Sequence, residues 1–75
     1  MDMWMVIEIY NREIMRKIPV HGHAAAVRQA NEWMKAEYAK TASVNGRGYA
    51  NTENNCAWIT YGNGKVYDVY VVEVA

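Results

Sequence analysis

Residues 66–74 read Val-Tyr-Asp-Val-Tyr-Val-Val-Glu-Val, and this stretch decides the fold. Only Asp68 and Glu73 interrupt a run of valine and tyrosine, so both alternating sets of side chains are largely apolar. Such residues favour strands, and a strand that is apolar on both faces is typical of the middle of a sheet. We therefore expect Lys65 to Val74 to form the central strand.

The preceding stretch, Cys56 to Tyr61, predicts a neighbouring strand that is joined to the central one through Gly62-Asn63-Gly64. An Asn-Gly pair favours a two-residue type I′ turn, because both residues tolerate positive φ. A turn at Asn63-Gly64 would pair Tyr61 with Val66. The C-terminal part of the chain is thus expected to form a β-hairpin.

The N-terminal residues predict a second hairpin, whose first strand runs from Met3 to Tyr10. Side chains alternate between the faces of a strand, so one face carries Met3, Met5, Ile7 and Ile9 and the other Trp4, Val6, Glu8 and Tyr10. Asn11-Arg12 suits a tight turn because Asn tolerates positive φ, while Arg at the second position leaves a longer loop open.

The return strand is expected over Glu13 to Val20, at an edge of the sheet. With a two-residue turn, the cross-strand pairs are Ile9–Ile14, Ile7–Arg16, Met5–Ile18 and Met3–Val20. One face of this hairpin is then apolar apart from Arg16. An inward-leaning arginine and a late Pro19 both discourage a further strand from pairing here.

Between Gly22 and Lys40 the apolar spacing changes to that of a helix. The residues that recur at this spacing are Val27, Ala30, Met34 and Tyr38, flanked by Ala26 and Trp33 and opposite Arg28, Gln29, Glu32 and Lys35. The start lacks a Ser, Thr, Asp or Asn cap, which leaves Gly22 or His21 in that position. We expect one amphipathic helix that covers one face of a sheet.

These elements predict a single α+β domain over residues 1–75, in which two β-hairpins flank one helix (β-β-α-β-β). The first and last strands are the most apolar, so we expect them to be adjacent and parallel, with the helix as a right-handed crossover. The result would be one four-stranded mixed sheet in the spatial order 2-1-4-3, with the helix on one face. A domain of this size buries only about 60% of its unfolded surface, and oligomerisation commonly adds the stability that so small a core lacks.

One helix leaves the other face of the sheet uncovered, and we expect that face to be apolar. We assign to it Trp4, Val6, Tyr10 and Met15, joined either by Trp58, Val69 and Val71 or by Tyr61, Tyr70 and Val72. Apolar patches of more than a few hundred Å² usually mark interfaces, and aromatic residues and Met are enriched at interface cores. We therefore expect a homodimer or tetramer with Trp4 near the centre of the contact. The alternative is that the long loop folds over the face, with Tyr49 as its plug.

Residues 41–55 form a connector that is long for so small a domain and rich in turn formers. Such connectors are usually functional or disordered. As a functional arm, this one would grip a partner with Arg47 and Tyr49. As a spacer, which its four asparagines and two glycines between positions 45 and 55 slightly favour, it would only join the helix to the next strand.

No pattern of catalytic, cofactor-binding or metal-binding residues is recognisable. His21-Gly22-His23 supplies half of a zinc shell at best and no Cys pair completes it, so His23 is expected to be partly buried or to contact the helix start. Ser43 is the only serine, no phosphate-binding loop is present, and the carboxylates are spread over polar positions. We expect neither an enzyme nor a cofactor.

The eight basic and eight acidic residues balance, so no net field attracts nucleic acid. The single Cys56 cannot form an internal disulfide and is expected to be a small buried hydrophobe in a cytoplasmic protein. The N-terminal apolar run is too short to span a membrane and has no features of a signal peptide.

Two function classes remain. The first, which we favour, is a non-enzymatic interaction protein that self-associates through its open sheet face and binds or inhibits a macromolecular partner, in the manner of small phage or mobile-element accessory proteins. The second is a single-stranded nucleic-acid-binding module that stacks bases on sheet aromatics and contacts phosphates through Arg12, Arg16, Lys17, Arg47 and Lys65. Salt-dependent binding of single-stranded DNA or RNA would separate the two.

Overall fold

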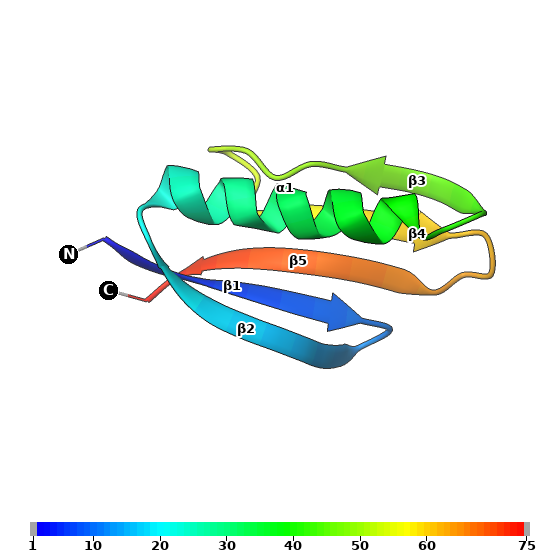
Figure 1. Cartoon of the computed structure of the whole chain (residues 1–75), viewed down its shortest axis with the longest axis horizontal. Coiled ribbons are helices and arrows are strands. Elements are labelled where there is room, and N and C mark those ends of the chain that lie inside the picture. Colours follow the sequence, from blue (N-terminus) through cyan, green and yellow to red (C-terminus); the bar gives the residue numbers. More distant parts are fainter. Residues whose placement is uncertain (1, 75) are drawn as a thin grey trace.

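One helix packs on one face of a five-stranded antiparallel sheet (Figure 1) in the structure, a computed structural model that describes residues 2–74. The elements in chain order are β1 (Met3–Tyr10), β2 (Glu13–His21), α1 (His23–Ala39), β3 (Val44–Gly48), β4 (Cys56–Tyr61) and β5 (Val66–Glu73). The strand order is β2-β1-β5-β4-β3, so β5 lies in the centre as its composition predicts.

The α+β class, with two hairpins around one helix, is confirmed, but the expected four-stranded mixed sheet is wrong. Residues 44–48, expected to belong to a structureless connector, form β3 at an edge of the sheet. This extra strand adds one reversal of chain direction before β4. As a result, β5 runs antiparallel to β1 instead of parallel.

The sequence of β3 hides its strand character, because Val-Asn-Gly-Arg-Gly contains residue types that are depleted in strands. The two glycines have a packing reason. The indole of Trp58, on the paired strand β4, lies against Gly46 and Gly48, and a Cβ atom added at Gly48 would overlap it. The Trp58 side chain therefore occupies the space that side chains at positions 46 and 48 would otherwise fill.

The first hairpin turns at Asn11-Arg12, where both residues have positive φ (47° and 75°), and the predicted two-residue turn is confirmed. The pair Ile9–Ile14 is also as expected. Beyond it a β-bulge at Met15 shifts the register, so that Ile7 pairs with Lys17 and not with Arg16. The rest of the predicted register is therefore wrong by one residue. The shift brings Arg16, Ile18 and Val20 onto the face that the helix covers.

The second hairpin has a three-residue loop, and the predicted two-residue turn is wrong. The amide of Gly64 donates to the carbonyl of Tyr61 (3.0 Å), and the amide of Tyr61 donates to the carbonyl of Lys65 (2.9 Å). Only Gly64 has positive φ (88°), as in a type I turn followed by a glycine bulge. Val66 therefore pairs with Thr60, and Tyr61 shares the covered face with Tyr67.

The core lies between α1 and the sheet. Its buried residues include Ala26, Ala30 and Met34 from the helix, and Trp4, Val6, Ala57, Ile59, Tyr61, Tyr67, Val69 and Val71 from the strands. The helix predicted between Gly22 and Lys40 is confirmed to within one residue at each end. Gly22 is the N-cap, with φ 91° and no capping side chain.

The open-face assignment of Trp4, Val6 and Tyr10 is wrong. Val6 is fully buried, Trp4 is 9% exposed, and Tyr10 packs against the same core. Met15 is exposed at the bulge, beside a hollow under the helix. Both alternating sets of β1 are apolar, so alternation alone did not reveal which set faces α1. The covered set even includes Glu8, whose partner Arg16 the expected register had paired with Ile7.

Candidate functional site

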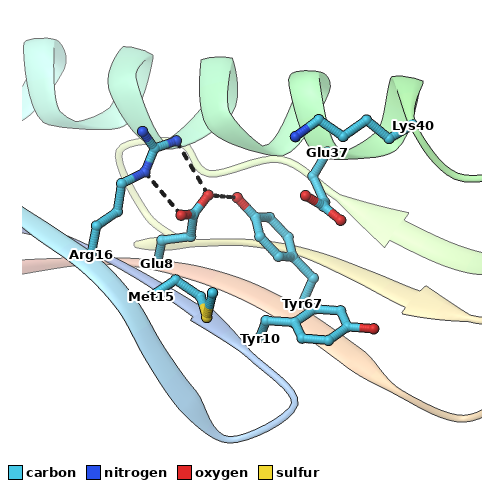
Figure 2. Close-up of a pocket in the computed structure, with 7 residues that line it drawn as sticks. All are labelled: Glu8, Tyr10, Met15, Arg16, Glu37, Lys40 and Tyr67. Carbon is cyan, nitrogen blue, oxygen red and sulfur yellow. Dashed lines mark hydrogen bonds and ion pairs between the residues drawn. The ribbon is translucent and has the colours of Figure 1, made fainter.

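Two regions carry the polar chemistry of this small domain, and the first is a hollow of about 500 Å³ under the C-terminal half of α1 (Figure 2). Its lining consists of Glu8, Tyr10, Met15, Arg16, Glu37, Lys40 and Tyr67. These residues come from β1, β2, β5 and the helix. The hollow is therefore a meeting point of elements that are distant in the sequence.

Glu8 is the centre of this hollow, and its carboxylate accepts hydrogen bonds from two other strands. The hydroxyl of Tyr67 donates to Oε2, and Nε of Arg16 donates to Oε1 at 2.9 Å (Figure 2). The Arg16 guanidinium also lies 3.9 Å from the ring centroid of Trp33 on the helix. Burial, and then the bond to Glu8, raise the pKa of Tyr67, so its hydroxyl remains a donor.

Glu37 repeats this arrangement from the helix side. Its Oε2 accepts a hydrogen bond of 2.6 Å from the hydroxyl of Tyr61 on β4. Burial, and then the bond to Glu37, raise the pKa of Tyr61. Tyr10 packs edge-on against Tyr61, with ring centroids 5.9 Å apart. Glu37 thus links the helix to β4, and Glu8 links β1 to β2 and β5. Because the pKa of each tyrosine is raised, neither is an activated nucleophile.

The second region is the face of the sheet opposite α1, which we call the open face (Figure 1). Directly paired residues share a face, so the register gives its apolar members as Met3, Met5, Ile7, Ile9, Ile14, Pro19, Cys56, Trp58, Val66, Tyr70 and Val72. Tyr70 is 41% exposed and Val72 is 43% exposed. The predicted apolar open face therefore exists, but with the other alternation of β1.

Two charged side chains, Lys17 and Asp68, lie among these apolar residues. Asp68 is flanked by Ile9 on β1 and by Trp58 on β4. Desolvation by this burial raises the pKa of Asp68. Within residues 2–74 neither Asp68 nor Lys17 has an ion-pair partner. A second hollow, of about 420 Å³, opens beside Asp68 between the two hairpin turns.

The residues predicted to grip a partner, Arg47 and Tyr49, contact the helix of their own chain. The guanidinium of Arg47 lies 4.2 Å from the ring centroid of Tyr38, and Nζ of Lys35 lies 5.7 Å from that of Tyr49. Tyr49 is therefore on the helix side of the molecule, and the alternative in which it plugs the open face is wrong.

The rest of the connector is fastened to the helix by side-chain amides. Asn31 donates to the carbonyl of Ala50 (2.9 Å) and accepts from its amide (2.8 Å). Nε2 of His23 is 2.6 Å from Oδ1 of Asn55, and the His23 ring stacks on Trp4 at 4.1 Å. The expectation that His23 is partly buried is confirmed, and these contacts fasten the connector after β3 to the helix.

Cys56 lies on the open face and is partly buried, as expected for a small hydrophobe. Burial, and then the charge of Asp68, raise the pKa of its thiol to about 11, so it is protonated at neutral pH. Across residues 2–74, no three His, Cys, Asp or Glu side chains gather closely enough to hold a metal ion. None of the helical residues described forms a segment long and apolar enough to cross a membrane.

Comparison with known proteins adds no relative. No protein-family model, curated protein or solved structure matches the chain.

Sequence reasoning offered Tyr70 as one of two alternatives for the open face but missed Ile7, Ile9 and Asp68 beside it. One signal could have found them. The helix stripe contains small residues, Ala26 and Ala30, which can accept a bulky side chain from the sheet, and Trp4 is buried in the same core cluster. The set of β1 that contains Trp4 is thus the one suited to lie under the helix.

Proposed function

We propose that this protein is a non-enzymatic interaction protein whose open sheet face binds a second copy of the chain. The observation that carries the proposal is a sheet with one helix on one side and a nearly continuous apolar surface on the other. Soluble proteins rarely leave a large apolar patch in water unless it meets another surface. A closed two-fold dimer uses the same patch twice, so it needs only one such surface per chain.

The energetics are compatible with a stable dimer. Burying one large apolar side chain contributes roughly 1.5 to 3 kcal/mol, and association itself costs on the order of 4 to 15 kcal/mol. Several such side chains from each copy would supply the roughly 8 kcal/mol of net binding energy that a micromolar dimer needs. Dimerisation would also add the stability that a domain of 75 residues otherwise lacks.

The dimer is the form in which we propose that the protein binds or inhibits a macromolecular partner, as a phage or mobile-element accessory protein would. The nucleic-acid alternative has weaker support. The open face carries an anion at Asp68, and Trp58 packs on Gly46 and Gly48 within its own sheet. A titration with single-stranded DNA at low salt tests it: binding that weakens steeply as salt rises would favour that alternative.

Self-association is tested by sedimentation equilibrium on the native chain and on two matched variants, Tyr70→Lys and Tyr38→Lys. The two tyrosines are 41% and 37% exposed, on the open face and on the helix respectively. A lysine at position 70 reaches water in the monomer but is buried in the dimer, so it should raise the dissociation constant at least about tenfold. Tyr38→Lys should leave it unchanged. A native chain that stays monomeric at about 100 μM, well above the micromolar range, would refute the proposal.

A further inference from the structure

Lys17 and Asp68 carry opposite charges among the apolar residues of the open face, and within residues 2–74 neither forms an ion pair. Lys17 is exposed on β2, and Asp68 is partly buried on β5, with β1 between them. Within residues 2–74 the only ion pair is Arg16–Glu8, on the opposite face. The two opposite charges are therefore separated on one face, and Arg12 lies at the hairpin turn that borders the hollow beside Asp68.

We propose that two copies of the chain pair through this face with reciprocal Lys17–Asp68 contacts, each lysine meeting the aspartate of the other copy. This inference rests on the proposed function, because it specifies how the open face meets itself. It also assigns a role to two residues whose side chains form no hydrogen bond or ion pair within the described part of the chain.

The register sets the geometry of this contact. Lys17 lies directly beside Ile7 of β1, and Asp68 lies directly beside Ile9 on the other side of the same strand. The two charges are two strands apart, roughly 10 Å, and two residues apart along the strands, roughly 7 Å. Their midpoint falls on β1 between Ile7 and Ile9.

Consider a two-fold axis that lies between the two facing sheets, passes over that midpoint and is perpendicular to the line that joins the charges. Rotation about this axis exchanges the positions of the two charges. Each Lys17 is then placed over the other copy's Asp68, and both contacts form at once, as an isologous interface requires. The strands of the two sheets would cross steeply, which is closer to orthogonal than to aligned sheet packing. The isoleucines occupy the centre, and Tyr70 is buried beside them.

The surroundings of Asp68 favour a lysine as its partner. The carboxylate is flanked by Ile9 and Trp58, so its hydration is already incomplete in the single chain. A lysine brings an apolar stem for these side chains and a charge for the carboxylate. Arg12 lines the hollow beside Asp68 but forms no ion pair with it. An unpaired carboxylate buried by a second copy would cost far more than a paired one.

The test is charge complementation between two variants, Lys17→Glu and Asp68→Lys, followed by sedimentation equilibrium. In a dimer of either variant both reciprocal contacts bring like charges together, which should raise the dissociation constant at least about tenfold. In an equimolar mixture the mixed dimer has two contacts of opposite charge. The mixture should therefore restore an affinity within about threefold of the native chain. Lys35→Glu on the helix reverses a charge but keeps both contact residues, so it is the control and should dimerise like the native chain.

The outcomes separate the two proposals. A native dimer whose weakened variants do not complement each other would overturn the Lys17–Asp68 contact and leave self-association intact. A native chain that is monomeric throughout would overturn both. If circular dichroism shows that either charge-reversed variant is unfolded, Lys17→Gln, Asp68→Asn and their combination replace them. Their effects on the dissociation constant should then be strongly non-additive, and additive effects would overturn the contact.

Discussion

The two faces of this sheet differ in how their polar side chains are paired. Under the helix, Glu8 and Glu37 each accept a hydrogen bond from a tyrosine of another element, and no buried polar side-chain atom within residues 2–74 lacks a partner. On the open face, Lys17 and Asp68 have no ion-pair partner in the same stretch. One side is thus complete within the chain, and the other is suited to a second surface.

The largest expected effect is a difference in unfolding free energy between substitutions at two neighbouring positions of β5, one on each face. Val71 is 3% exposed under the helix, and Val72 is 43% exposed on the open face. Val71→Asp buries an unpaired charge and should cost at least about 4 kcal/mol, enough to unfold so small a domain. Val72→Asp should cost less than about 1 kcal/mol in the monomer. Urea unfolding at low protein concentration measures both, and equal costs would contradict the assignment of faces.

An intermediate effect is expected at the network of the covered face. Glu8→Ala leaves the Tyr67 hydroxyl and the Arg16 guanidinium without their shared acceptor, which should cost about 2 to 3 kcal/mol. Glu13→Ala, at an exposed position of the neighbouring strand, is the control and should change stability by less than about 0.5 kcal/mol. If thermal unfolding shows the two variants to be alike, the network does not stabilise the fold.

The smallest effect is a pH dependence from Asp68 on the open face. Its pKa is raised in the folded chain by desolvation, so folding favours the protonated form. The resulting stabilisation is fully present below the unfolded pKa of about 3.9 and is lost as pH rises through the folded pKa. The native chain should therefore lose stability relative to Asp68→Asn over that range. Urea midpoints measured from pH 3 to 7 test this, and parallel curves would show that Asp68 is fully hydrated.

Sequence patterns predicted the elements well and their pairing poorly, and single residues explain the difference. The central position of β5, the turn at Asn11-Arg12 and the helix all follow from local composition. The register does not, because a bulge at Met15 and a three-residue loop ending at Gly64 each shift a hairpin by one position. Local composition does not distinguish these from the regular alternatives, and only packing against the helix decides between them.

The predicted positions of the site residues were wrong for the same reason. Trp4 and Val6 were expected outside because both sets of β1 are apolar, and one register shift changes which side chains of the neighbouring strand share their face. Strand β3 was missed because its two glycines gain their partner, the indole of Trp58, only across the sheet. A pairing between distant residues leaves no periodicity in the sequence around either of them.

The bulge makes one codon of β2 dispensable for the pairing of the strand. Met15 is the extra residue between the pairs Ile9–Ile14 and Glu8–Arg16, so deleting it would leave both pairs in place. Every later residue would keep its side, with Arg16 under the helix and Lys17 on the open face. An in-frame deletion at this position would thus remove only the local bend and extra twist that a bulge gives to a strand.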